Sequence, residues 1–489
     1  MSKLIEALLA RQYLLLILIA LLLLVSGINT YSLRGSTEPR EAGVAAEMLQ
    51  DGDYVVPRLN GEKFLEKPPL SYWLQAASLR VFGYEPFAVR APSILAGVLC
   101  VCLMFFAVER LLNSRELAWL AALLLLTMAS FWMNARIAGQ DVLLTLGVAI
   151  TLFGFYFAHS CSLQKSAAQK YWWLLYALGV FVATFTKGVI GAAIPGFVIV
   201  VFLCVDAQVF QRGWRIGDWL RPMLFAMVGV VPLALWLFAL YQQQGFGDVS
   251  TLLWANSFER FSGDYTRGAH SEPFYYYLKK LPETFAPWNL LLFAALWQMR
   301  KQIVRERNLA FFCCWLLAPY LLLSLSAGKR PTYLLMIYPA AAVLIALFMQ
   351  GVLAQPLRAR AWRRCVAAAL ALLAILYIGY GGMMLRRDKD ADSMQAVFAS
   401  LHELEQQGHT VILFQPIERV AGGARFYLQH SVAKLDDAVQ LQALLERDRT
   451  AAILIADGDI AQLHDYRVLK SFLDQKRKYL IIAGALVTP

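Results

Sequence analysis

Charge is scarce in this sequence of 489 residues, of which 16% are Asp, Glu, Lys or Arg, whereas a typical soluble protein carries about 25%. The shortage falls on the first part of the chain, where long apolar runs recur up to about residue 384. Hydrophobic residues make up 59% of the chain, and its mean hydropathy is +0.52. This composition argues against a soluble enzyme and predicts a polytopic membrane protein with a soluble tail.

Several motifs that would indicate other classes of protein are also missing. The seven cysteines lie in apolar runs or at their ends, with no Cys-x-x-Cys pair, so neither a disulfide framework nor a zinc site is expected. No Gly-rich phosphate loop accompanies the β-rich runs of the tail, and no convincing internal repeat is found. The net charge of +11 comes from basic residues in short segments between apolar runs, which is the pattern of the positive-inside rule and indicates no nucleic-acid partner.

At about 20 apolar residues per crossing, the sequence predicts about 11 to 13 transmembrane helices, with interfacial helices in the first outer loop. The short basic connections mark the cytoplasmic side. Two long connections, 29–90 and 242–284, are therefore predicted to be loops on the outer side, and an odd number of spans places the tail on the same side. The expected spans lie near residues 13–28, 91–108, 117–133, 142–158, 171–186, 189–205, 223–241, 285–299, 309–325, 333–353 and 366–384.

The tail, residues 386–489, has a different pattern from the membrane domain of residues 1–385. Predicted helices alternate there with short β-rich runs, which is typical of a small α/β domain. The pair Gly422-Gly423 is interpreted as a turn. The runs expected to form strands are 410–414, 452–456 and 479–482.

Charged residues of the first outer loop stand among many Pro, Gly and aromatic residues. They include Glu38, Arg40 and Glu41, followed later by the pair Glu66-Lys67. One interpretation is an amphipathic stretch at the membrane surface with solvated charges. The other is an ordered site at the level of the lipid headgroups.

Further basic residues occur at the predicted outer ends of distant spans. They lie in Arg136–Asp141, in Thr186–Gly188, which contains Lys187, and in Gly328–Tyr333, which contains Lys329. Each alone is consistent with a side chain that anchors a helix at the membrane surface. Together they predict a convergent basic pocket for a phosphate or pyrophosphate headgroup, because ionisable groups at membrane depth are costly and usually functional.

The order of these motifs resembles that of the aminoarabinose lipid A transferases. More broadly, it is similar to the protein-mannosyltransferase-like branch of the C-type membrane glycosyltransferases, which share the GT-C fold. The resemblance extends from residue 30 to about residue 335. The motifs that carry it are Thr37–Arg40, Gly52–Gly61, Glu66–Pro69 with Tyr72-Trp73, Arg136–Asp141, Thr186–Gly188, His270–Tyr276 and Gly328–Tyr333.

The resemblance implies a bacterial inner-membrane enzyme that transfers a sugar, with inversion, from a polyprenyl (undecaprenyl) phosphate donor to a periplasmic acceptor. The acceptor would be lipid A or another envelope glycan or lipid. The acidic positions of the family match Glu38, Glu66 and Asp141 as catalytic candidates. The donor phosphate would be bound by Arg40, Lys67, Lys187 and Tyr333, and the basic pocket adds Lys329.

Other positions are candidates for binding the acceptor or ordering the loops, namely Thr37, Glu41, Arg136 and His270. In some relatives a metal ties the two long outer loops together, and Glu66 and His270 would be the matching ligands of such a structural divalent metal. A hydrogen-bonding histidine is the alternative, since two ligands do not make a metal site. No cofactor is required by the expected reaction.

One position departs from the family. The usual Asp-Glu pair is here Thr37-Glu38, and threonine is no general base at neutral pH. Glu38, Glu41 or Asp141 would then accept the proton, unless the acceptor is a phosphate, which is already anionic and needs no strong base.

Three alternatives remain open at this stage. They are a protein O-glycosyltransferase with the same donor, a transporter of lipid-linked saccharides, and an inactive relative that binds envelope partners. A transporter should carry polar or broken helices near the bilayer midplane, whereas the predicted spans are nearly free of charge. A monomer satisfies every one of these interpretations.

Overall fold

The computed structural model describes residues 3–29, 31–164, 166–259, 262, 272–353, 359–387, 393–474 and 477–485. The chain forms two compact units. The first contains Met1–Ser26, Leu65–Ser71 and Ser93–Tyr377, and the second contains Gly27–Phe64, Tyr72–Pro92 and Ile378–Pro489. The first outer loop is thus divided between the units.

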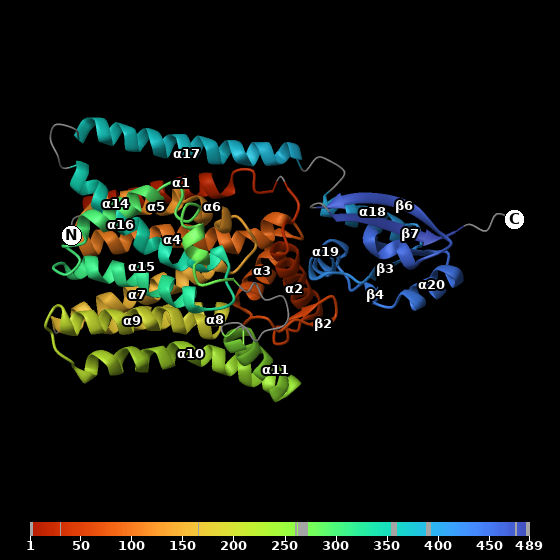
Figure 1. The fold of residues 1–489 in the computed structure, drawn as a ribbon, viewed down its shortest axis with the longest axis horizontal. Coiled ribbons are helices and arrows are strands. Elements are labelled where there is room, and N and C mark those ends of the chain that lie inside the picture. The colour runs from red at the N-terminus through yellow and green to blue at the C-terminus, as the bar shows by residue number, and fades with distance from the viewer. Residues whose placement is uncertain are drawn as a thin grey trace. The chain divides into compact units, whose positions relative to one another are not determined.

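The first unit is helical, and its long helices run side by side (Figure 1). Helices α4 and α17 begin or end in the second unit. The elements are α1 (Lys3–Val25), α4 (Pro86–Leu112), α5 (Arg115–Thr127), α6 (Ala129–Ala135), α7 (Asp141–Leu163), α8 (Gln169–Lys187), α9 (Val189–Gln208), α10 (Ile216–Gln244), α11 (Phe246–Ser250), the π-helix η1 (Thr251–Glu259), α13 (Tyr276–Lys280), α14 (Asn289–Met299), α15 (Arg307–Leu325), the 3-10 helix η2 (Pro331–Ile337), α16 (Tyr338–Leu353) and α17 (Ala359–Arg387).

Within the described residues, six helical segments are long and apolar enough to cross a membrane. Helices α5 and α6, bent by 70° at their junction, add a seventh if they form one span. Shorter apolar helices occur at Arg11–Val25, Asn289–Met299 and Arg364–Tyr380. Each span expected from the sequence overlaps a helix, so the prediction of a polytopic α-helical membrane protein is confirmed.

Helices α7 and α8 are joined by a short connection and pack against each other through glycines. A methyl group at Gly179 would lie 2.3 Å from the backbone nitrogen of Thr151, and one at Gly154 would lie 2.7 Å from that of Tyr176. Small residues at such crossings let helix backbones approach closely in membranes. The antiparallel arrangement brings Lys187, at the end of α8, beside Asp141, at the start of α7.

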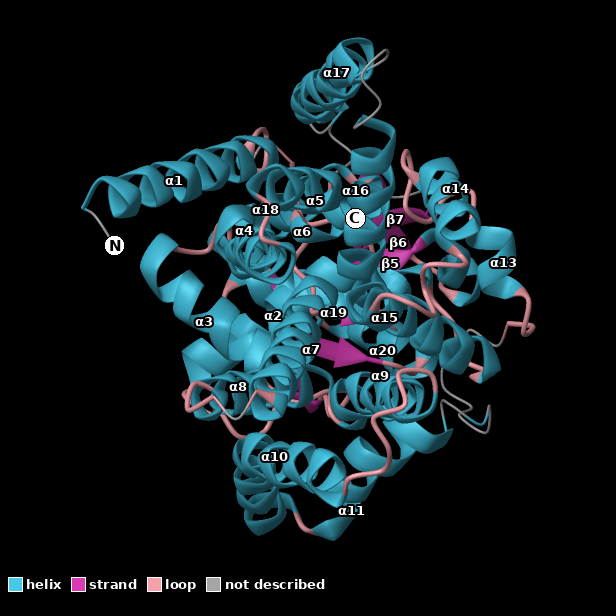
Figure 2. Ribbon diagram, turned by 90° about the vertical axis from the view of Figure 1, so that its left-hand side faces the viewer, coloured by secondary structure: helices cyan, strands magenta, loops and turns pink. Residues whose placement is uncertain are grey.

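The second unit contains a five-stranded sheet, whose strands are drawn in magenta in Figure 2. The strand order is β4-β3-β5-β7-β6. Strand β3 runs parallel to both of its neighbours, β4 and β5. Strand β7 runs antiparallel to both of its neighbours, β5 and β6. The three expected strands are confirmed as β3, β5 and β7. The elements are α2 (Thr37–Asp51), β1 (Arg58–Leu59), β2 (Glu62–Lys63), α3 (Leu70–Phe82), α18 (Met394–Gln406), β3 (Thr410–Phe414), α19 (Glu418–Leu428), β4 (Ala433–Leu435), α20 (Ala438–Arg447), β5 (Ala451–Ala456), the 3-10 helix η3 (Asp457–Gln462), β6 (Tyr466–Asp474) and β7 (Arg477–Gly484).

Apolar side chains cover both faces of this sheet. On one face Leu413 and Leu454 pack with Phe398 of α18, and on the other Ile453 packs with Leu441 of α20. Every residue of β5 is buried, as expected for a central strand that is covered on both sides. The predicted α/β domain is therefore a sheet between helices.

The interpretation of Gly422-Gly423 as a turn is wrong, because both residues lie inside α19. The glycines serve close packing instead. A methyl group at Gly422 would lie 2.3 Å from the carbonyl oxygen of Pro39, and one at Gly43 would lie 2.6 Å from the Cα of Gly422. Helix α19 therefore touches the backbone of α2, the helix that carries the charged residues of the first outer loop.

Candidate functional site

The centre of the candidate site in the first unit is the ion pair between Lys187 and Asp141. The side chain of Lys187 is 10% exposed and that of Asp141 is 25% exposed. The Thr332 side chain also hydrogen-bonds to Asp141, and Lys67 interacts electrostatically with the same carboxylate. Four segments far apart in the sequence thus bring polar groups to one end of α7.

Tyr333 completes this cluster. The Lys187 ammonium lies 4.7 Å from the centroid of the Tyr333 ring. Gly188, with a φ of +61°, ends α8 beside Pro68, and a methyl group at Gly188 would lie 3.7 Å from the Pro68 Cγ. A left-handed φ favours glycine, so the chain can turn sharply at this helix end. Pro68 lies beside the turn, and its neighbour Lys67 interacts electrostatically with Asp141.

Lys67 and Lys187 both interact with the Asp141 carboxylate. An anion bound beside Asp141 would meet two cations, and phosphate oxygens accept such charge-assisted hydrogen bonds well. The partial exposure of Asp141 leaves the cluster accessible from outside the bundle. The arrangement is therefore suited to a phosphate group at the end of the membrane-spanning helices.

Lys329 has a different environment, although it belongs to the same sequence motif as Tyr333. It is 3% exposed, and its ammonium donates to the carbonyl oxygen of Glu272 at 2.8 Å and to that of Ser326. Burial lowers the pKa of Lys329 below its ordinary value. In these contacts the Lys329 ammonium hydrogen-bonds to backbone carbonyl groups of two separate segments. Its role in phosphate binding stays a prediction.

Arg136 contacts the end of α1. Its guanidinium donates to the carbonyl oxygens of Leu23 at 2.9 Å, Leu24 at 3.0 Å and Ser26 at 2.6 Å. The last carbonyls of a helix have no partner within the helix, and a basic side chain there also complements the helix dipole. Arg136 therefore holds the end of α1, which explains a buried arginine at this depth without a ligand.

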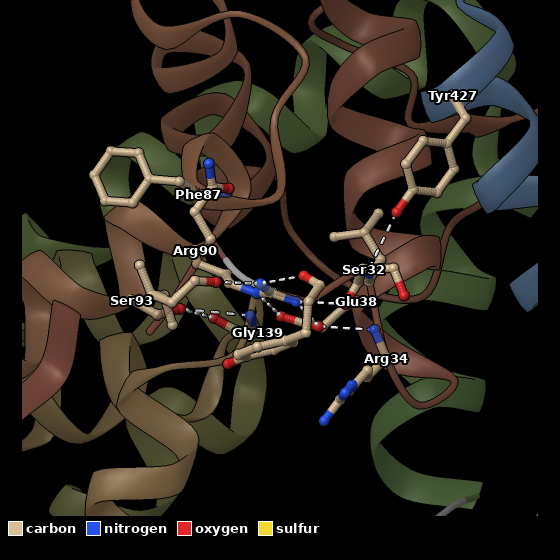
Figure 3. A network of polar contacts seen from close by, with 12 residues as sticks. Ser32, Arg34, Glu38, Phe87, Arg90, Ser93, Gly139 and Tyr427 are labelled. Atoms are coloured by element: carbon tan, nitrogen blue, oxygen red, sulfur yellow. Dashed lines mark hydrogen bonds and ion pairs between the residues drawn. The ribbon is translucent and has the colours of Figure 1, made fainter. Parts of the chain in front are cut away.

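In the second unit, Glu38 forms a buried bidentate ion pair with Arg90 (Figure 3). The Arg90 Nε donates to Oε1 at 2.7 Å and a terminal nitrogen donates to Oε2 at 2.8 Å. The remaining N–H groups of Arg90 reach the carbonyls of Ile28, Tyr31 and Ser32. The backbone N–H of Arg34 also donates to Glu38 Oε2 at 2.8 Å. This network fixes the chain before α2.

The other charged candidates of α2 are also buried. Glu41 is 0% exposed, while Thr37 begins the helix and is partly exposed. Arg40 is 7% exposed and donates to Glu418 of α19 at 2.9 Å, with its guanidinium 5.5 Å from the Phe64 ring. Helix α2 is therefore an ordered element with paired charges, which excludes the interpretation of a solvated surface stretch.

Only one of the two candidate metal ligands is described. Glu66 is partly exposed in the Leu65–Ser71 segment, and His270 lies outside the described residues. Across the described ranges, no group of three or more His, Cys, Asp or Glu side chains is arranged to hold a metal ion. A divalent metal at Glu66 therefore stays a prediction, and no step of a reaction is built on it.

Sequence reasoning missed three residues that this geometry brings to attention. Arg90 is 0% exposed and pairs with Glu38. It could have been found from the sequence, because an ionisable residue at the edge of a predicted span is usually functional. Thr332 stood inside a quoted motif but was not named as a site residue. Glu418 gave no signal, because an acidic residue at the start of a tail helix is typical of an exposed helix end.

Comparison with known proteins identifies the fold. The family model described as dolichyl-phosphate-mannose-protein mannosyltransferase matches residues 66–236. The structure superposes on the crystal structure of ArnT from Cupriavidus metallidurans bound to undecaprenyl phosphate with a TM-score of 0.78 and 20% identity, covering 97% of this chain and 99% of that one. A relative that is 31% identical over 76% of this chain shows the family. The chain is an ArnT-like protein with the GT-C fold. The resemblance predicted from the motifs is thereby confirmed.

Two further comparisons define the extent of the similarity. The ArnT-like chain is 32% identical over 314 residues to the undecaprenyl phosphate-alpha-4-amino-4-deoxy-L-arabinose arabinosyl transferase of Edwardsiella ictaluri, covering 64% of this chain and 55% of that protein. It is 31% identical over 377 residues to the protein of that name from Pectobacterium carotovorum, covering 76% and 65%. The chain thus spans less than two thirds of the length of these relatives. The archaeal oligosaccharyltransferase AglB from Archaeoglobus fulgidus superposes with a TM-score of 0.58 and 12% identity, covering 90% of this chain and 65% of that one.

Proposed function

We propose that the ArnT-like chain is an inverting glycosyltransferase that uses a polyprenyl phosphate-linked sugar, with undecaprenyl phosphate as the carrier lipid. The acceptor is lipid A or another glycan or lipid of the cell envelope, on the periplasmic face of the bacterial inner membrane. The observation that carries this proposal is the cluster of Lys67, Lys187 and Tyr333 around Asp141 at one end of the spans. The similarity to arabinosyl transferases named for an undecaprenyl phosphate donor supports the choice of donor.

The cluster accounts for the leaving group of such a transfer. The acceptor oxygen attacks the anomeric carbon from one face while the bond to the phosphate oxygen breaks on the other. The phosphate leaves with the electron pair and gains negative charge, which Lys67 and Lys187 stabilise. Cations held in a low-dielectric pocket are effective at this task because they are already oriented before the charge develops. Asp141 acts here as a positioning residue that holds Lys187.

The fate of the acceptor proton separates the classes of acceptor. A phosphate acceptor is already an anion, so it needs no base, and this agrees with Thr37 in the place of the usual aspartate. A hydroxyl acceptor, as in protein O-glycosylation, would require a base. Asp141 and Glu66 are then the better candidates, because both carboxylate oxygens of Glu38 accept hydrogen bonds in its ion pair. The threonine at position 37 therefore supports a phosphate acceptor.

The proposal is tested by transfer of radiolabelled sugar from a panel of polyprenyl phosphate donors to envelope extracts, with the products separated into lipid, glycan and protein. Binding of undecaprenyl phosphate is measured in parallel for Lys187→Met and for Lys187→Arg. Loss of a hydrogen bond to a charged group is worth about 1.5–3 kcal/mol, so we expect roughly 10- to 100-fold weaker binding for Lys187→Met. Partial rescue is expected for Lys187→Arg.

The matched control is Lys301→Met, in the exposed connection between α14 and α15. This change removes the same charge away from the cluster, so donor binding should be retained. Unchanged donor affinity in Lys187→Met would remove Lys187 from the phosphate site. Label that crosses the membrane while still attached to the polyprenyl carrier would instead assign the chain to the transporters.

A further inference from the structure

A large cavity opens at the end of the first unit opposite to Asp141. Its volume is about 1130 Å³, and its walls come from α4, α5, the last turns of α7, the connection before α10 and the first turn of α15. Helix α7 has 23 residues, and a rise of 1.5 Å per residue separates its two ends by about 35 Å, slightly more than the hydrocarbon core of about 30 Å. The cavity is therefore separate from the candidate donor site.

The lining of this cavity is strongly basic. Glu109 is the only acidic residue among the lining residues, and it pairs with Arg115 at 2.7 Å. Asp206 lies behind the lining. Arg212 and Arg307 pair with Asp206, and Asp218 lies 3.7 Å from His159 in the same network. The arginines of the lining are Arg110, Arg115, Arg212, Arg215 and Arg307.

Arg307 is fixed in place by a buried ionic network. Its Nε lies 2.6 Å from Asp206 Oδ1, and a terminal nitrogen lies 3.1 Å from Oδ2. The imidazole of His159, which is 1% exposed, lies 3.0 Å from the same carboxylate. The Arg307 side chain itself is 16% exposed. A guanidinium held in this way is a pre-organised donor, because its rotamer is fixed before any ligand binds.

Two other arginines of the lining have no such acidic partner. In the part of the chain that the structure describes, neither Arg110 nor Arg215 forms an ion pair with an acidic residue. The Arg110 guanidinium lies 4.9 Å from the Trp172 ring centroid and 5.9 Å from that of Phe157. Such ring contacts hold a cation without neutralising it. The cavity therefore combines positive charge that is not balanced within the fold with an apolar aromatic wall.

We propose that this cavity binds the headgroup of an anionic phospholipid. The phosphate would be held by Arg110, Arg215 and Arg307, and the acyl chains would continue along the apolar spans. Basic pockets between membrane helices are suited to anionic headgroups, since such lipids are concentrated at the surface where the helices end. Arginines that only anchor helices at the membrane surface need neither a cavity nor a buried Asp–His pair behind one of them.

The test uses the full chain in nanodiscs and measures retention of phosphatidylglycerol against phosphatidylcholine by native mass spectrometry. The double variant Arg110→Gln/Arg215→Gln removes the two arginines that lack acidic partners and leaves the network of Arg307 intact. At about five-fold per basic residue near a membrane surface, we expect roughly 25-fold weaker retention of phosphatidylglycerol. Arg110→Lys/Arg215→Lys should keep most of the binding, because it keeps the charge.

The matched control is Lys301→Gln/Arg305→Gln, which removes the same charge from an exposed connection outside the lining of the cavity. Retention of phosphatidylglycerol close to that of the parent chain is expected for this variant. If both double variants lost phosphatidylglycerol retention equally, the binding would come from general surface charge, and the proposal would be overturned. Absence of preferential retention in the parent chain would overturn it as well.

Inorganic phosphate distinguishes the two sources of the same chemical group. A cavity for lipid should release little phosphatidylglycerol when millimolar phosphate is added. Binding of phosphate alone that depends on Arg110 and Arg215, with no retained lipid, would assign the cavity to a soluble phosphate and contradict the lipid proposal.

Discussion

The buried ion pair of Glu38 and Arg90 provides the sharpest prediction, because a structural role and a catalytic role lead to opposite results. The side chains are 2% and 0% exposed, and two parallel hydrogen bonds join them. In Glu38→Gln the positive charge of Arg90 stays buried without its counter-ion. Removing one partner of a buried pair typically costs about 3–5 kcal/mol, and we expect a loss of that size in the free energy of unfolding.

The paired variant shows whether the loss comes from this interaction. Arg90→Met removes the guanidinium and leaves the buried Glu38 carboxylate without this counter-ion, so it should also destabilise strongly. The double variant Glu38→Gln/Arg90→Met leaves no unpaired charge, and its loss should be smaller than the sum of the two single losses. Interaction energies between contacting residues are about 0.5–3 kcal/mol in such cycles.

The measurement is reversible unfolding of the purified chain in mixed detergent micelles, combined with donor binding and sugar transfer. The exposed pair Lys280–Glu283 supplies the control, since Glu283→Gln should leave unfolding almost unchanged. If Glu38→Gln unfolds like the parent chain and yet loses transfer while it still binds donor, the structural assignment fails and Glu38 acts as the base.

Two further predictions concern the second unit. Gly422→Ala should lower the free energy of unfolding by about 1–3 kcal/mol, because the new methyl group would meet the backbone of Pro39 at 2.3 Å, whereas Gly458→Ala, with open space around it, should not. Burial raises the pKa of Glu47 above its ordinary value of 4.5, so the folded state binds the proton more tightly than the unfolded state. The contribution of Glu47 to stability should therefore fall as pH rises from 4.5 through the raised pKa, and Glu47→Gln should abolish that part of the slope. Unfolding midpoints of both proteins between pH 4.5 and 8 test this, and identical slopes would contradict it.

Much of the fold could be predicted from the sequence because the signals are local. A run of about 20 apolar residues indicates a span whatever surrounds it, and β-rich runs bounded by turns indicated β3, β5 and β7 correctly. The interpretation of Gly422-Gly423 failed because local propensity disfavours glycine in a helix, whereas its contact with Pro39 is a tertiary feature. A close helix crossing requires glycine at residues that only the fold brings together.

The candidate site was predicted unevenly for a related reason. Charged residues at the outer ends of spans are conspicuous, so Lys187 and Asp141 could be named as neighbours of a phosphate site. Whether a charge meets a ligand or a protein group depends on its partner, and partners such as Arg90 for Glu38 and the end of α1 for Arg136 come from distant segments. Residue type and position therefore marked these side chains as candidates, while the partners of Glu38 and Arg136 required the structure.

The division of the first outer loop between the two units bears on the function of the tail. Lys67 belongs to the first unit, whereas Glu38 and Arg40 belong to the unit that also contains the tail. Helix α19 of the tail contacts α2 through Gly422 and Gly43 and pairs with Arg40 through Glu418. A truncation at residue 386 would remove α19. The face of α2 that is buried against α19, with the charged Arg40, would then be exposed to solvent. The tail therefore holds in place the helix that carries Arg40, one of the residues predicted to bind the donor.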